Sequence, residues 1–206
     1  EDMSWSCGDD LAISHDDDDD VAPADASITY GTVLTDLTGS DKCWITRNLG
    51  ATTQASSATD STAASAGWYW QFNRKQGYNH NGTTVTPAWT ITSISESSDW
   101  TSAQDPCTLE LGTGWRLPTS NEWDNADSNG AWSNYNNTYA SVLKIHAAGY
   151  LFSSDGSLNY RGSFGFYWSS TQINSTFGYY LNVDDIDSNV GNGIKAYGFS
   201  GRCLKD

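Results

Sequence analysis

The hydrophobic pattern along the chain predicts many short strands separated by polar turns. Segments 27–37 and 42–49 are rich in Thr, Val, Ile and Tyr, and the turn cluster Thr38-Gly39-Ser40-Asp41 separates them. Further strands are expected at 147–152, 157–161, 166–171, 178–183 and 194–204, of which the first two form a hairpin. None of these segments repeats another.

Two helices are expected between these strands. Pro118 ends an extended segment, and Thr119 and Glu122 then form a T-x-x-E capping box at the start of the first helix. Glu122 is therefore expected to cap the helix, and a catalytic acid is the alternative. The second helix is expected at 135–146, with an apolar stripe ending at His146. The element order predicts a mixed α+β fold.

The segment from Tyr160 to Asp206 departs from this regular pattern. The motifs GFYWSST and GFSGRCLKD bracket a stretch in which aromatic, aliphatic and acidic residues follow no amphipathic period. A strand that buries one face alternates strictly. The mixture here resembles antibody loops, which present Tyr, Ser, Gly and Asn from a scaffold. The segment therefore points to binding rather than catalysis.

Composition supports an extracellular, β-rich module. Hydrophobic residues make up only 37% of the 206 residues, but 10 Trp and 11 Tyr can build a core from few large side chains. Charged residues make up 17%, and Ser, Thr, Asn and Gly supply the remaining polar surface. We expect a single domain at 27–206, since this length suits one core.

The net charge of -15 excludes several classes of partner. Nucleic-acid binding needs a cationic face that displaces counterions, and 10 Lys and Arg spread along the chain do not form one. Anionic membrane surfaces are disfavoured for the same reason. No apolar run is long enough to insert into a membrane.

Four cysteines stand at positions 7, 43, 107 and 203. Their spacing fits no zinc motif, because no two lie within a metal-knuckle distance. An even number favours two disulfides, for which three connectivities are possible. Order and context favour Cys7–Cys43 and Cys107–Cys203, and four buried free thiols are the alternative.

The first 26 residues are acidic and poor in apolar side chains. The run Asp16–Asp20 repels itself, so we expect 1–26 to be a solvated, flexible segment outside the domain. A calcium loop is a weaker interpretation, because five consecutive Asp lack the alternating ligands and the distal Glu.

Candidate catalytic groups are sparse. None of His15, His80 and His146 stands at metal-ligand spacing from another ligand, and no nucleophile elbow or phosphate-binding loop is present. Asp184, Asp185 and Asp187 could hold a cation or act as exposed contact residues. We therefore expect no enzyme activity and no cofactor, and whether a metal is bound stays open.

Four motifs resemble one protein family: KCWITRNLG (42–50), GWRLPTSNEW (114–123), FYWSST (166–171) and GFSGRCLKD (198–206). Together they resemble the variable proteins of diversity-generating retroelements, which are related to the major paralogous domain of Fibrobacter and to formylglycine-generating enzymes. The resemblance covers 27–206. It implies a C-type lectin-like fold, with two helices on short mixed and antiparallel sheets, long loops and insertions.

The resemblance also implies a function. In such proteins adenine-directed mutagenesis, largely at AAY codons, diversifies a C-terminal segment, here about 162–198. The result is a hypervariable ligand-binding site on a rigid scaffold. The expected variable residues all belong to the set that NNY codons encode: Phe164, Phe166, Ile173, Thr176, Phe177, Tyr180, Val183, Asp184, Asp185, Ile186, Asp187, Val190, Gly191, Gly193 and Tyr197. Trp168, Gln172, Lys195 and Lys205, which NNY cannot encode, fall at scaffold positions.

Some features depart from related families. Formylglycine-generating enzymes use a pair of reactive cysteines near the C-terminus, where this chain has only Cys203. Sugar-binding lectins carry EPN or QPD with WND, and none of these occurs. The expected protein is thus a surface-displayed or extracellular receptor or adhesin for an unknown protein or cell-surface ligand. A fixed lectin-like adhesin is the main alternative, and an oxidase of the formylglycine-generating type is a third.

Overall fold

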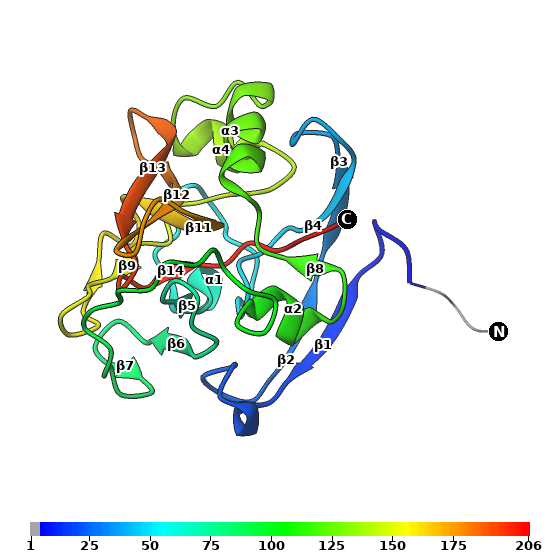
Figure 1. The fold of residues 1–206 in the computed structure, drawn as a ribbon. Coiled ribbons are helices and arrows are strands. Elements are labelled where there is room, and N and C mark those ends of the chain that lie inside the picture. Colours follow the sequence, from blue (N-terminus) through cyan, green and yellow to red (C-terminus); the bar gives the residue numbers. More distant parts are fainter. Residues whose placement is uncertain (1–4) are drawn as a thin grey trace.

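The long strands gather in one seven-stranded sheet, to which the C-terminal segment contributes four neighbouring strands. The computed structural model describes residues 5–206 (Figure 1). The strand order is β13-β12-β11-β14-β5-β6-β7. The bounds are β5 (Tyr69–Trp70), β6 (Gly77–His80), β7 (Val85–Thr86), β11 (Gly165–Gln172), β12 (Phe177–Val183), β13 (Ser188–Ile194) and β14 (Phe199–Ser200). Only the β11–β14 pairing is parallel within this sheet.

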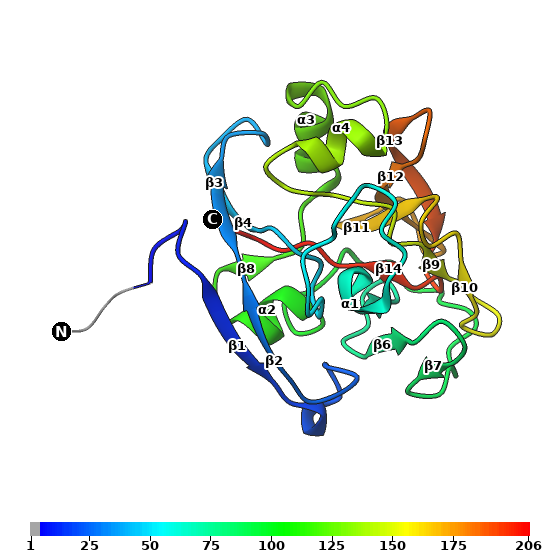
Figure 2. The ribbon, with the colours of Figure 1, turned by 180° about the vertical axis from the view of Figure 1, so that it is seen from behind.

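A second sheet joins the first part of the chain to its last residues. Its order is β3-β4-β15-β8, with bounds β3 (Thr32–Thr35), β4 (Lys42–Ile45), β8 (Trp115–Arg116) and β15 (Leu204–Lys205). Strand β15 therefore lies between β4 and β8. Two hairpins flank the sheets, one formed by β1 (Leu11–His15) and β2 (Ala26–Tyr30), the other by β9 (Tyr150–Leu151) and β10 (Leu158–Asn159). Figure 2 shows the second hairpin beside β14.

Four short α-helices occur within residues 5–206, where the sequence predicted two. They are α1 (Ala63–Ala66), α2 (Pro106–Leu111), α3 (Ser120–Asn129) and α4 (Tyr135–Ala140). The capping box of α3 is confirmed, because the Thr119 side chain accepts from the Glu122 N–H and the Glu122 side chain accepts from the Thr119 N–H. Helix α3 packs on β11, β12 and β13 (Figure 1). With more sheet than helix, the fold is mixed α+β, as expected.

Two predicted elements end earlier than the pattern suggested. The predicted helix at 135–146 stops at Ala140, because Ser141 is extended and Lys144 adopts a left-handed φ of 53°. The predicted strand at 27–37 divides into β2 and β3 at Gly31, where a Cβ atom would lie 2.8 Å from Oγ1 of Thr46. The division at Gly31 arises from a tertiary contact that a local pattern does not contain.

The core is built from large aromatic side chains on both faces of the long sheet. On one face Tyr167, Leu181 and Val183 pack with Trp44 and Trp123. On the other face Trp168 packs with Phe72, Trp100 and Phe199, with ring centroids 5.3, 6.3 and 4.3 Å from its own. Successive residues of a strand face opposite sides, so β11 contributes to both halves of the core.

The N-terminal segment is a correction to the prediction. Residues 5–26, expected to be flexible, include β1, which pairs with β2 over five residues. Leu11 and Ile13 pack against the core, and His15 is buried. The run Asp16–Asp20 stays exposed as the tip of this hairpin, with a 3-10 turn at Asp17–Asp19. The domain therefore begins before residue 27, and the remainder of the expected flexible segment, 1–4, lies outside the described residues.

Both favoured disulfides are present, Cys7–Cys43 and Cys107–Cys203. The first fastens the β1 end of the chain to β4, and the second fastens α2 to the segment before β15. Disulfides are compatible with an extracellular, oxidising compartment. None of the helices within residues 5–206 has the length and apolar character of a membrane-spanning segment.

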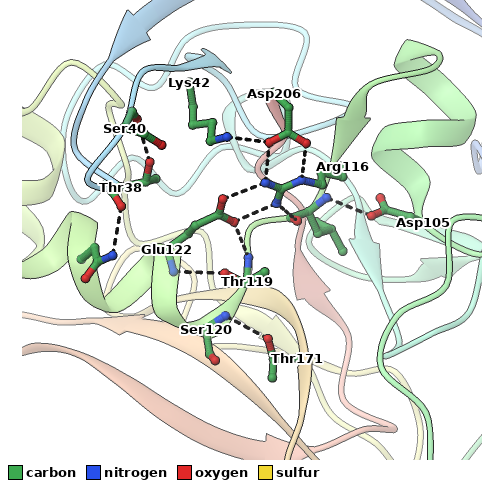
Figure 3. A network of polar contacts seen from close by, with 12 residues as sticks. Thr38, Ser40, Lys42, Asp105, Arg116, Thr119, Ser120, Glu122, Thr171 and Asp206 are labelled. Carbon is green, nitrogen blue, oxygen red and sulfur yellow. Dashed lines mark hydrogen bonds and ion pairs between the residues drawn. The ribbon is translucent and has the colours of Figure 1, made fainter.

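A charged cluster anchors the C-terminal residue (Figure 3). The Arg116 guanidinium donates to both carboxylate oxygens of Glu122 at 2.7 Å and to both of Asp206 at 2.9 and 2.7 Å. The Lys42 ammonium donates to Asp206 at 2.7 Å. Such bidentate pairs fix geometry as well as charge. The cluster thereby ties β15, β8 and the start of α3 together.

The disulfides yield the first prediction. Removing a crosslink costs more free energy of unfolding when the closed loop is longer, about 5 kcal/mol for the 96-residue separation and about 4 kcal/mol for the 36-residue one. Urea unfolding should therefore show a larger loss for Cys107→Ala/Cys203→Ala than for Cys7→Ala/Cys43→Ala. The reverse order would show that the N-terminal hairpin contributes more to the core than its position indicates.

The charged cluster around Arg116 yields the second prediction. Hydrogen bonds from Arg116 lower the pKa of Asp206, and they also outweigh the effect of burial to lower that of Glu122. A lowered folded-state pKa stabilises the fold above about pH 4–5, and this stability is lost as pH falls through the folded-state pKa. Arg116→Gln should cost roughly 1–3 kcal/mol at pH 7, and the difference from wild type should shrink towards pH 2 in urea unfolding.

Lys42→Gln is the matched control, because Lys42 reaches only Asp206, at the exposed edge of the cluster. Its cost should stay below about 1 kcal/mol. A cost for Arg116→Gln that does not change between pH 7 and pH 2 would contradict the role assigned to these ion pairs.

Candidate ligand-binding site

Seven aromatic side chains surround an open cavity of about 300 Å³ beside the long strands. We call this cavity the aromatic pocket. Its lining is Tyr150, Tyr160, Phe164, Phe166, Tyr180, Tyr197 and Phe199, together with Asn192 and Gly193. Ligand sites in proteins are typically concave and largely apolar, with a few polar groups that orient the ligand. The pocket has this character.

Separate segments of the chain supply these side chains. Tyr150 comes from β9, Phe166 from β11, Tyr180 from β12 and Phe199 from β14. Tyr160 follows the β9–β10 hairpin with a left-handed φ of 56°, which is rare for a bulky residue, and is 57% exposed. Its ring therefore belongs to the rim of the pocket, whereas Phe199 is 2% exposed and belongs to the base.

The base of the pocket is rigidly supported. Phe199 stacks on Phe166 at 5.2 Å and packs on Trp168 at 4.3 Å. Trp168 is fully buried, and its indole N–H donates to the Trp70 carbonyl oxygen at 2.7 Å. A side chain locked by packing and by a hydrogen bond holds its neighbours in place. The base of the pocket thus rests on the packed core.

Two glycines of β13 make room for the Tyr180 ring. A Cβ atom on Gly193 would lie 2.9 Å from Cε1 of Tyr180, and one on Gly191 would lie 3.2 Å from its Cζ. The pairing of Tyr180 with Gly191 places the ring over this glycine-containing strand. The size of the residue at 193 therefore limits where the Tyr180 ring can lie.

Four tyrosine hydroxyl groups gather around the pocket. Burial raises the pKa of Tyr150, with a further contribution from the phenol groups of Tyr197, Tyr160 and Tyr180. Burial and Tyr197 raise the pKa of Tyr180 in the same way. These two hydroxyls are therefore neutral at physiological pH. Across residues 5–206, no protein group is hydrogen-bonded to any of the four hydroxyls, so they are free to meet a ligand.

Eleven of the fifteen residues expected to vary fall into three groups. Phe164, Phe166, Tyr180, Gly193 and Tyr197 line the aromatic pocket. Ile173, Thr176 and Phe177 lie at the β11–β12 connection, and Asp185, Ile186 and Asp187 form the exposed β12–β13 connection, where Ile186 is 83% exposed. These connections are at opposite ends of β12, so the sequence segment forms an extended surface rather than one compact loop.

Three of the expected contact residues face inward. Val183 is 0% exposed and lies in the core beneath α3, and Val190 is half-buried against the same cluster. The Asp184 carboxylate is buried and accepts from the N–H groups of Ile186 and Asp187 at 2.9 and 2.8 Å. The contact role predicted for Val183 and Asp184 is therefore wrong: one fills the core and the other holds a turn.

A cation site at Asp184, Asp185 and Asp187 gains no support from this arrangement. In the part of the chain from residue 5 onward, only Asp16, Asp17 and Asp18 bring three acidic ligands close enough together for one ion, and all three are exposed. This group is the tip of the β1–β2 hairpin and is distant in sequence from the aromatic pocket.

Four lining residues were not predicted from the sequence: Tyr150, Tyr160, Asn192 and Phe199. The density of aromatic residues between 150 and 166 was the available signal, because it exceeds what a short hairpin needs for its own core. The hairpin prediction assigned Tyr150 and Tyr160 to strands and gave no indication that they face β12.

Glu122, the candidate acid of the sequence, and two buried histidines lie elsewhere in the fold. A general acid needs a pKa near the working pH, whereas the Arg116 hydrogen bonds lower that of Glu122 despite its burial. Burial lowers the pKa of His146 to about 3, and its imidazole is enclosed in the core. His15 is buried between Glu110 and the Tyr30 hydroxyl. None of these groups lines the aromatic pocket.

Comparison with known proteins gives no assignment: no protein-family model, curated protein or solved structure matches this chain.

The glycine contacts yield the third prediction. Gly193→Val should push the Tyr180 ring into the aromatic pocket, because the added Cβ lies closer than van der Waals contact allows. The Tyr180 ring resonances should then shift in NMR spectra of selectively labelled protein, while the remaining aromatic core signals stay in place. Gly191→Ala is the matched control and should move the ring less. Unchanged Tyr180 resonances in Gly193→Val would contradict this packing.

Proposed function

We propose that this chain is a ligand-binding protein of the receptor or adhesin type, a retroelement-diversified variable protein with a C-type lectin-like fold. The observation that carries the proposal is the position of five expected variable residues around one aromatic pocket. These five come from 164–197, and β11, β12, β13 and the turn before β14 bring them together.

The scaffold positions support the same division. Trp168 and Lys195, which NNY codons cannot encode, are 0% and 1% exposed. The Lys195 ammonium donates to the Glu96 carbonyl oxygen at 2.6 Å and to the Gln172 side chain at 2.8 Å. A substitution at either position would leave a cavity or an unpaired buried group, each of which costs much more than a surface substitution. Diversification that left such positions unchanged would leave the ability to fold intact.

The exposed chemistry suits a macromolecular partner. Aromatic residues are frequent among the residues that dominate binding energy, and the pocket concentrates seven of them. Asp185 and Asp187 are exposed on the β12–β13 connection and favour a partner with basic groups. Two disulfides favour display outside the cell, on a cell or virus surface.

The fourth prediction tests this proposal. It concerns the sequences of this gene and its flanking DNA across the source population. Codons for pocket and connection residues should vary within the NNY set at adenines of a nearby near-identical repeat. Codons for Trp168, Lys195, Val183 and Asp184 should be constant or conservatively changed, because their side chains are buried.

An invariant segment without a nearby repeat would overturn diversification. The aromatic pocket would then belong to a dedicated adhesin of fixed specificity, and protein and glycan arrays would identify its partner. Variation that is equally frequent at buried and exposed codons would contradict the assignment of scaffold and contact positions.

A further inference from the structure

We infer that the aromatic pocket receives an alkylammonium group carried by the partner. The inference rests on the proposed ligand-binding function and names the chemistry recognised by the same site. It follows from three properties of the pocket: the orientation of its rings, the charges around it, and its size.

The rings form walls in two orientations. The Phe199 ring lies nearly parallel to the Phe166 ring and to the Tyr197 ring, with interplanar angles of 23° and 17°. Tyr150 crosses all three at 72–84°, and Tyr180 crosses Phe166 and Phe199 at 61° and 72°. The centroid distances in these pairs are 4.9–5.9 Å. These distances are contacts between the rings themselves, so the rings form a continuous aromatic lining around the open cavity. A cation is attracted to aromatic ring faces within about 6 Å, so a positive group in the cavity can contact more than one ring.

The pocket contains no positive charge of its own. Its lining includes no Lys, Arg or His. The two cationic residues nearest in sequence are directed elsewhere: Arg161 donates to the Tyr69 hydroxyl and the His80 carbonyl oxygen, and Lys195 donates to Glu96 and Gln172. No protein cation therefore competes with a ligand for the rings.

The remaining electrostatics also favour a positive ligand. The chain carries 25 acidic against 10 basic residues, and its net charge of -15 attracts cations and repels anions. The hydroxyl oxygens of Tyr150 and Tyr180 are neutral and can accept hydrogen bonds from N–H groups. An anionic ligand would meet electron-rich ring faces and a repulsive field, so we exclude it.

The volume sets the size of the bound group. About 300 Å³ is at the lower end of the range for small-molecule sites, and the pocket is open at the rim beside Tyr160. This space suits the head group of a side chain or lipid-like molecule better than a whole folded element. A methylated or free alkylammonium group fits, with its chain leaving past the rim.

The fifth prediction compares choline with 3,3-dimethylbutan-1-ol, which has the same shape but carries carbon in place of the charged nitrogen. In NMR titrations of the intact protein, choline should shift the Tyr180 and Tyr197 ring resonances. It should bind about fivefold more tightly than the neutral compound, the ratio expected of a single cation–ring contact. Both compounds are probes of the pocket and not candidates for its natural partner.

Two variants test whether the aromatic ring of Tyr180, and not merely its apolar volume, binds the cation. Tyr180→Leu should weaken choline binding about fivefold and leave the neutral compound nearly unchanged, because only the ring is lost. Tyr179→Leu is the matched control, since the adjacent residue of β12 points to the opposite face of the sheet and is absent from the lining. Its choline affinity should equal that of the wild type.

Equal affinity for the two compounds would overturn the inference in favour of a simple apolar pocket. Binding of neither compound, or pocket shifts produced by a methyl glycoside instead, would also overturn it, the latter in favour of a sugar site. None of these outcomes decides whether the segment is diversified, because the population sequencing tests that proposal independently.

Discussion

Trp168 is the residue on which the arrangement of the molecule depends. Its indole N–H donates to the Trp70 carbonyl oxygen, and its own carbonyl oxygen accepts from the Trp123 indole at 3.1 Å. One residue thus connects β11 to β5 across the intervening strand and to the helix above the sheet. Burying two indole N–H groups without partners would be costly, so these hydrogen bonds define one packing of the three elements.

This constraint separates a fixed interior from an adaptable surface within the same strands. On β11, Tyr167 faces the core beneath α3, whereas Phe166 contributes to the aromatic pocket. On β12, Leu181 is buried, whereas Tyr180 lines the pocket. Because strand residues alternate between faces, neighbouring positions along the chain have very different tolerance to substitution. A diversified segment can therefore include long strands, provided that only one face changes.

The sequence predicted features that depend on local chemistry. The capping box at Thr119 and Glu122 needs only residues three positions apart, and the two disulfides follow from a small number of possible pairings. It did not predict the β1–β2 hairpin, because its alternation involves few inward side chains beside a dominant acidic run. It also did not assemble the aromatic pocket. Tyr150 and Tyr197 are 47 positions apart along the chain and lie together where Leu151 pairs with Gly198.

The contact between Gly193 and Tyr180 limits which pairs of residues can occupy these two positions. The two positions share one volume, because a side chain at 193 occupies the space into which the Tyr180 ring extends. A large residue at 193 is compatible with a small or displaced residue at 180, whereas this chain combines the small Gly193 with the large Tyr180. The choices at these positions are therefore not independent, and the number of workable surfaces is smaller than the product of the residues allowed at each. If the segment is diversified as proposed, packing limits its diversity as much as the coding capacity of the codons does.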